Sequence, residues 1–276
     1  MIDFEIPEDA RTVRNKVRKF VQEECHPAEE SCTADNFESV LAELRGKARA
    51  QGLWCPFIPQ EHGGMGLRPL ANALVQMELG ESFLGALSMN TQGPDDATML
   101  TLLEHGTDHQ KEKFLKPLLN GEKRICYSMT EKAAGADATG MQTTAVLEGD
   151  EWVLNGEKWF SSSASVADIA VVMAKTDPDA PRHEQYSTFI VELPNAGYEI
   201  VRNIETMQPH TELGLKLGGS HSEINIENLR VPRENILGGR GQGFNMGQHR
   251  LAYGRLRHGM HNVAIAQRAL DLAAGH

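Results

Sequence analysis

The stretch YSMTEKAAGAD at residues 127–137 divides this 276-residue sequence into two regions of different character. Upstream of it, apolar side chains recur at the three- and four-residue spacing of amphipathic helices. Downstream, short apolar runs at residues 169–173 and 189–191, together with alternating apolar and polar residues, are typical of β-strands. We therefore predict a helical region up to residue 122, followed by a β region.

The helical region contains four apolar stripes and one capped segment. The stripes begin near Ala10, Phe37, Leu70 and Met99. The first is expected to stop at His26-Pro27, and Thr107 is the expected N-cap of a short helix that closes at Asn120-Gly121. Because this cap separates His105 from His109, we predict two solvated histidines rather than a pair of metal ligands.

Turn residues divide the β region into strands. Gly149-Asp150 offers one turn, and Asn155-Gly156 is the strongest hairpin dipeptide in the chain. The strand patterns follow one another without a helical pattern between them. This order predicts an antiparallel β domain rather than the alternating strands and helices of a nucleotide-binding fold.

A glycine-rich segment at residues 238–243 follows the β region. Its glycines lack the spacing of a dinucleotide-binding loop, and we interpret it as a hinge. The remaining residues predict one helix of about 30 residues with an apolar stripe. A helix is normally stabilised by burying such a stripe, yet no later segment of the sequence can cover it. We therefore expect that a second subunit covers this helix or that the natural domain continues beyond His276.

The composition is that of a soluble globular protein with an acidic balance. The 27 Lys and Arg residues against 38 Asp and Glu give a net charge of −11, which argues against general binding to nucleic acid or anionic lipid. No apolar run approaches the roughly 20 residues that span a bilayer, and the N-terminus shows no export or transit signal. The four cysteines lack the spacing of a disulfide framework or a zinc site. We expect a cytoplasmic protein with reduced thiols.

Four motifs in sequence order carry a specific resemblance. They are GL…IP…GGMG at residues 52–66, YSMTEKAAGAD at 127–137, NGEKWFSS at 155–162 and VPRENIL…GQGF at 231–244. By these motifs the whole chain resembles the acyl-CoA dehydrogenase family. The resemblance implies an α+β fold with an N-terminal helical domain (residues 1–122), a central antiparallel β-barrel-like domain (123–238) and the first helix of a truncated C-terminal helical domain (239–276).

The resemblance also implies a reaction. Members of the family bind FAD and remove the α and β hydrogens of an acyl-CoA thioester, with a carboxylate taking the α proton while a hydride moves to flavin N5. It implies acyl-CoA as the substrate, an electron-transfer flavoprotein or similar acceptor as the partner, and a homo-oligomeric assembly.

The family's flavin contacts map onto two of the motifs. On this chain they fall on Tyr127, Met129, Thr130, Phe160, Ser161 and Ser162. The implied substrate contacts are Ala136, where the family has a serine, and Arg255. We also predict that a basic patch on the last helix receives the polyanionic coenzyme A. The residues of this predicted patch are His249, Arg250, Arg255, Arg257, His258 and His261.

The sequence offers no assignable catalytic base. The family keeps its carboxylate either late in the C-terminal domain, which we expect beyond residue 276, or directly before the matched arginine, where this chain has Gly254. Glycine cannot accept a proton, and we interpret Glu131 and Asp137 as structural loop residues. We therefore predict that the chain as given is inactive. A non-catalytic partner subunit, and a flavin oxidase or monooxygenase on the same fold, are the alternatives.

Overall fold

The computed structural model describes residues 5–207 and 211–275, which form two compact units. The β unit is Ala97–Leu251, and the helical unit combines the residues up to Asp96 with those from Ala252 onward. The β unit includes the short helices before residue 120, because the side chain of Gln110 donates to the carbonyl oxygens of Glu234 and Ile236 at 2.7 and 2.8 Å. The division into three domains at residues 122 and 238 stays a prediction.

The helices follow the apolar stripes of the sequence. They are α1 (Glu8–Phe20), α2 (His26–Ser31), α3 (Phe37–Ala50), α4 (Pro69–Leu79), α5 (Gly85–Ser88), α6 (Asp95–His105), α7 (Asp108–Gln110), α8 (Lys116–Leu119), α9 (Glu212–Lys216) and α10 (Gly243–Ala274). The predicted cap at Thr107 is confirmed: its hydroxyl accepts from the Gln110 amide, and the Gln110 side chain accepts from the Thr107 amide.

The predicted stop at His26-Pro27 is wrong. A π turn at Val21–Cys25 connects α1 to α2, and the helical path ends only at Ser31. Proline has no backbone N–H, so it interrupts the regular ladder of helical hydrogen bonds. The wider turn that directly precedes Pro27 changes the hydrogen-bond register there, which allows the chain to remain helical.

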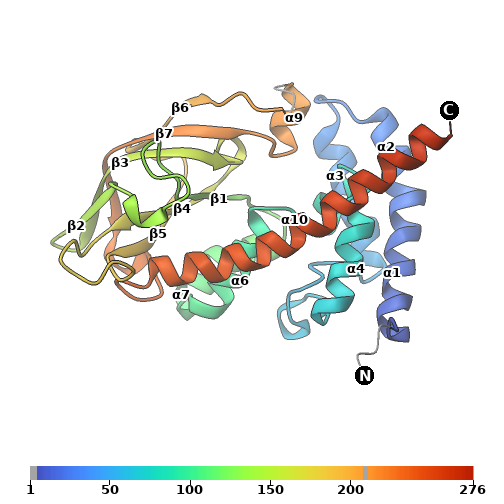
Figure 1. The fold of residues 1–276 in the computed structure, drawn as a ribbon, viewed down its shortest axis with the longest axis horizontal. Coiled ribbons are helices and arrows are strands. Elements are labelled where there is room, and N and C mark those ends of the chain that lie inside the picture. The colour runs from blue at the N-terminus through green and yellow to red at the C-terminus, as the bar shows by residue number, and fades with distance from the viewer. Residues whose placement is uncertain (1–4, 208–210, 276) are drawn as a thin grey trace. The chain divides into compact units, whose positions relative to one another are not determined.

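A buried carboxylate joins α1 to α4, which lie side by side (Figure 1). Glu78 near the end of α4 is only 2% exposed. It accepts from Nε of Arg14 at 2.6 Å and from Nε and Nη2 of Arg18, both at 2.9 Å. The two-pronged contact of Arg18 has the planar geometry that arginine offers a carboxylate. We call Glu78, Arg14 and Arg18 the α1–α4 clamp.

The last helix has the predicted length, since α10 runs over 32 residues. In the helical unit, Ala264 of α10 is buried and lies close to Gly80. A Cβ atom added to Gly80 would lie only 2.8 Å from the Cβ atom of Ala264. Large apolar side chains of the same helix are exposed. They are Leu256, Val263, Ile265, Leu270 and Leu272. None of the helices within residues 5–207 and 211–275 is both long and apolar enough to cross a membrane.

The β unit contains one sheet. Its strands are β1 (Ile125–Ser128), β2 (Thr144–Glu148), β3 (Glu151–Ser162), β4 (Ile169–Lys175), β5 (Tyr186–Glu192), β6 (Tyr198–Asn203), β7 (His221–Pro232) and β8 (Ile236–Leu237). The order is β6-β7-β3-β1-β4-β5-β8, and β2 pairs with both β3 and β4. The sheet therefore closes into a ring through β1–β4, with further strands attached outside it (Figure 1).

The expectation of a purely antiparallel sheet needs one correction, because β4 pairs in parallel with β1 and with β2. The other strand pairs are antiparallel. The long β3 reverses the chain direction between β1 and β4, so these two can lie parallel without a crossover helix. The alternation of apolar residues cannot distinguish the two kinds of pairing, since both bury alternate side chains.

The turn at Gly149-Asp150 is confirmed, but Asn155-Gly156 is not a hairpin turn and lies inside β3. The pairing register of β3 with β7 shifts between Leu154 and Gly156. Gly156 has a φ of +150°, and a Cβ there would lie 2.5 Å from Oγ1 of Thr143. The glycine therefore serves a bulge and a close backbone approach within the strand.

Candidate active site

The structure brings the two predicted flavin motifs together at one end of β1 and β3. Tyr127 pairs with Ser162 across the two strands. Just beyond β1, the amide of Trp159 donates to the carbonyl oxygen of Thr130 at 2.7 Å. Two segments that are far apart in the sequence, one at residues 127–130 and one at residues 159–162, thus form one continuous surface. We call this surface, made of Tyr127, Met129, Thr130, Phe160 and Ser162, the β1–β3 corner.

The side chains of β3 at this corner alternate between surface and interior. Phe160 is 45% exposed, and Ser162 is half-buried. Ser161 between them is buried, and its hydroxyl lies 2.9 Å from that of Ser128. The Ser161 side chain thus points into the protein, and this orientation does not support its predicted contact with flavin, which stays a prediction. Phe160 also has a φ of +55°, a strained conformation for a bulky residue and one that occurs most often at functional sites.

His221 completes the corner, and the sequence analysis missed it. It begins β7 and pairs with Ser162, and its Nδ1 lies 2.9 Å from the Ser162 hydroxyl. The ring of Phe160 meets the His221 ring edge-on at 6.2 Å between centroids. His221 lies 59 residues from Ser162 in the sequence, and no motif around it indicates a functional role. Only the pairing register of β3 with β7 brings it to this corner.

Tyr127 lies beneath a cation. The guanidinium of Arg250 stands 4.0 Å from the centre of the Tyr127 ring, and its Nε donates to the Thr98 hydroxyl at 3.1 Å. Burial raises the pKa of Tyr127, and the charge of Arg250 opposes this rise. Arg250 therefore stacks on an aromatic ring, and it is not a free cation for coenzyme A.

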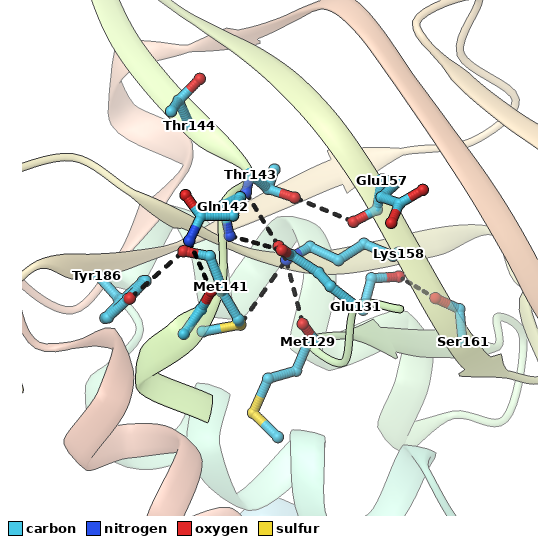
Figure 2. A network of polar contacts seen from close by, with 12 residues as sticks. Met129, Glu131, Met141, Gln142, Thr143, Thr144, Glu157, Lys158, Ser161 and Tyr186 are labelled. Carbon is cyan, nitrogen blue, oxygen red and sulfur yellow. Dashed lines mark hydrogen bonds and ion pairs between the residues drawn. The ribbon is translucent and has the colours of Figure 1, made fainter. Parts of the chain in front are cut away.

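Behind the corner, a buried ion pair holds the loop that follows β1 (Figure 2). Nζ of Lys158 lies 2.8 Å from Oε1 of Glu131, and neither side chain is more than 3% exposed. Glu131 also accepts from the amides of Gln142 and Thr143 at 2.5 and 3.0 Å. The geometry agrees with our interpretation of Glu131 as a structural residue. These contacts engage both of its oxygens, so it is poorly placed to act as a free base.

The rest of this loop is exposed. Ala136 is an exposed residue at its tip. The carboxylate of Asp137 accepts from the amide of Thr139 at 3.0 Å and pairs with Arg182 at 2.5 Å. Asp137 therefore shapes the loop, as expected, and the assignment of Ala136 to the substrate stays a prediction.

The predicted basic patch on α10 is only partly available: His249, Arg255 and His258 are exposed, whereas Arg250 and His261 are half-buried and Arg257 is buried. Arg257 is 8% exposed and its Nε lies 2.8 Å from Oδ2 of the buried Asp96. Burial lowers the pKa of His261 to about 4, so this ring is neutral at physiological pH. Arg255 is an exposed cation, and a Cβ on the neighbouring Gly254 would meet no atom within 4 Å. The periodicity of α10 did not reveal which cations face inward, because their acidic and polar partners are distant in sequence.

One group of potential metal ligands lies in the β unit. Ligand atoms of Glu104, His105 and His249 come within 4.8 Å of one another. The His105 side chain is 30% exposed, so its ring is only partly solvated, whereas His109 is exposed as expected. Glu104 is exposed, and its Oε2 lies 3.5 Å from Nε2 of His105; exposed acidic groups often come this close without binding an ion. The prediction of no metal site therefore stands as a prediction.

The comparisons with known proteins agree with this geometry. The model of the acyl-CoA dehydrogenase N-terminal domain matches residues 7–122, and that of the middle domain matches residues 126–228. The structure of "a putative acyl-CoA dehydrogenase from Mycobacterium abscessus" is 32% identical, with a TM-score of 0.88, over 97% of this chain and 69% of that one. The chain belongs to the acyl-CoA dehydrogenase family.

Two further relatives bear on function. The crystal structure of an acyl-CoA dehydrogenase complexed with FAD from Bacillus anthracis is 29% identical, with a TM-score of 0.78, over all of this chain and 46% of that one. Acyl-CoA dehydrogenase family member 10 from Mus musculus is 34% identical over 95% of this chain. The chain spans only a quarter of the length of that curated relative.

Proposed function

We propose that this chain forms the flavin-binding part of an FAD-dependent enzyme that dehydrogenates an acyl-CoA thioester between its α and β carbons. The observation that carries the proposal is the β1–β3 corner. There, matched motifs from two strands place an exposed aromatic ring beside hydroxyl groups.

The chemistry of the corner fits a flavin. An isoalloxazine ring is flat and largely apolar, with hydrogen-bonding atoms along one edge. The exposed ring of Phe160 offers a stacking face. The hydroxyls of Thr130 and Ser162 offer donors, and His221 can fix the orientation of the Ser162 hydroxyl through its Nδ1. Tyr127 and Met129 would complete the contact.

Bound FAD would supply the acceptor for the hydride that leaves the β carbon. The chain's own residues would orient the ring and favour electron gain through hydrogen bonds to its edge. The resemblance to the family assigns Ala136 and Arg255 to the acyl-CoA substrate, and we retain both residues as proposed contacts. We expect electron-transfer flavoprotein or a similar protein to receive the electrons.

Reconstitution tests the flavin site. The purified chain, incubated with FAD and freed of excess, should retain a yellow chromophore. Phe160→Ala should weaken FAD binding about fivefold, since an aromatic contact of this kind contributes about 1 kcal/mol. Phe83→Ala is a matched control, because Phe83 is also 45% exposed but belongs to the helical unit. Equal affinities of the two variants, or a chain that takes up no FAD, would contradict the proposal.

Catalysis by the chain as given should be slow. A positioned base typically contributes 10²–10⁴-fold to a proton transfer. Glu131 is held in its ion pair, and Gly254 has no side chain. Gly254→Glu should raise the rate of acyl-CoA-dependent dye reduction at least about tenfold, because the free space around Gly254 can accept a side chain. Ordinary enzyme rates in the unmodified chain that are abolished in a Glu131→Gln variant still folded by circular dichroism would instead identify Glu131 as the base.

A non-catalytic partner subunit is the second candidate. The glycine at position 254 and the engaged carboxylates of Glu131 and Asp137 favour it. In that case, the chain would bind flavin weakly or not at all and show no turnover, and Gly254→Glu would leave the rate unchanged.

A further inference from the structure

Lys158 is fully buried, and its ammonium contacts groups on both sides of the loop that follows β1 (Figure 2). Nζ lies 3.1 Å from the carbonyl oxygen of Met129, 2.8 Å from Oε1 of Glu131 and 3.8 Å from Sδ of Met141. An ammonium has three protons to donate. Lys158 therefore satisfies its hydrogen-bonding capacity within this loop.

Glu131 carries the connection further along the loop. Its carboxylate accepts from Lys158 and from the amides of Gln142 and Thr143, which lie at the other end of the loop. Glu131 and Ala134 also form an isolated backbone bridge. One buried carboxylate thus closes residues 131–143 into a ring, and Lys158 ties that ring to the turn that contains Met129 and Thr130. We call Lys158 and Glu131, with the backbone groups that they hold, the latch.

We infer that Lys158 is a positioning residue that fixes the flavin-facing turn at Met129 and Thr130 before flavin arrives. This inference rests on the proposed function of the β1–β3 corner. The ammonium would hold the Met129 carbonyl from inside the protein, so that the opposite face of the turn is presented to the ligand in one orientation. Lys158 itself touches neither the flavin nor the substrate.

The physical reason is the cost of an unsatisfied buried charge. If the turn moved away, the ammonium would lose the Met129 carbonyl with no water to replace it. A neighbouring amide reinforces the same position, because Trp159 donates to the Thr130 carbonyl at 2.7 Å. Consecutive residues of β3 therefore hold consecutive carbonyls of the turn, and less ordering remains to be done when the ligand binds.

Lys158→Met tests the inference, because it keeps an unbranched side chain of nearly the same length and removes the charge. We expect FAD affinity to fall about five- to tenfold, as for the loss of a hydrogen bond within the supporting shell. The midpoint potential of the bound flavin should become more negative, because a displaced Thr130 would stabilise the reduced ring less. Lys132→Met is the matched control: Lys132 follows Glu131 directly but is exposed and pairs with Glu223 and Glu157. It should keep the affinity and the potential of the unmodified chain.

Amide exchange of the unmodified chain gives a second measurement that needs neither flavin nor a variant. The amides of Gln142 and Thr143 should exchange at least about tenfold more slowly than that of Thr139, whose bond to Asp137 is exposed. Equal exchange rates would overturn the latch. So would a folded Lys158→Met variant with the FAD affinity and potential of the unmodified chain. Slow exchange at Gln142 and Thr143 in a chain that binds no FAD would instead refute the flavin site and retain the latch.

Discussion

Among the residues that the structure describes, Glu131 in the β unit and Glu78 in the helical unit are both buried, but their charges are neutralised by different kinds of partner. They are 3% and 2% exposed. Glu78 forms ion pairs with two arginines whose side chains remain 26% and 41% exposed. Glu131 accepts hydrogen bonds from one fully buried lysine and from two backbone amides. The pKa of each carboxyl lies below its ordinary value: burial alone would raise it, but the cationic partner and hydrogen bonds outweigh burial.

This difference shows that solvent access to the partner decides how much one residue matters. In the α1–α4 clamp, either arginine can be lost and the other still contacts Glu78, while water solvates the freed groups. In the latch, the loss of either charge leaves the other charge buried, with neither an oppositely charged partner nor water to solvate it. The clamp joins two helices and tolerates change, whereas the latch defines one loop conformation.

The largest effect should follow Glu131→Gln. The amide oxygen can replace only one carboxylate oxygen, and the amide NH2 must then face donors, either Lys158 or the backbone N–H groups. We expect a loss of about 3–5 kcal/mol in the free energy of unfolding, as for the removal of one partner of a buried ion pair. Urea denaturation followed by circular dichroism measures it. A loss below about 1 kcal/mol would mean that this site is far more hydrated than its burial indicates.

Glu78→Gln should cost less, about 1–3 kcal/mol, because the two arginine heads can turn toward water. Arg14→Met should cost less than about 1 kcal/mol, since Arg18 alone retains its two-pronged contact. The same denaturation experiment ranks the three variants. The comparison fails if Arg14→Met destabilises the chain as strongly as Glu131→Gln.

The pH dependence of stability should separate the two sites. Both carboxyls have folded pKa values below the ordinary 4.5, so each contributes stability that is complete above that value and is lost as the pH falls through the folded pKa. Burial lowers the pKa of Lys158 from 10.5 to about 8, against the opposing attraction of Glu131. Between these values the unfolded chain binds more protons, so stability from this group rises with pH. Lys158→Met should abolish that alkaline rise and leave the contribution of Glu78 intact.

The smallest effect should come from metal ions. The group of Glu104, His105 and His249 offers three potential donors, but Glu104 and His249 are exposed to water. We expect zinc chloride or a chelator to shift the melting temperature by less than about 1 °C, in contrast to the large stabilisation that a tightly bound ion gives. A zinc-dependent increase of several degrees that His249→Ala removes would establish a metal site here.

Much of the architecture could be predicted from the sequence, because it depends on local patterns. The capping box at Thr107 and the turn at Gly149-Asp150 are each specified by neighbouring residues. Local rules failed where another part of the chain changed their meaning. Asn155-Gly156 is read as a hairpin in isolation, but the pairing of β3 with β7 makes it a bulge. Pro27 is read as a stop, but the π turn before it carries the helical path onward.

By itself, the sequence determined the family, the order of helices and strands, and the two motifs that meet at the β1–β3 corner, because each is written in contiguous residues. Only the tertiary structure decided that His221 contacts the Ser162 hydroxyl, that Ser161 faces inward, and that Lys158 and Glu131 share a buried site. It also decided that Arg250 stacks on Tyr127 and that Arg257 is buried against Asp96, although both arginines belong to the predicted coenzyme A patch. Strand register and burial bring these partners together, and neither has a signature in the local sequence.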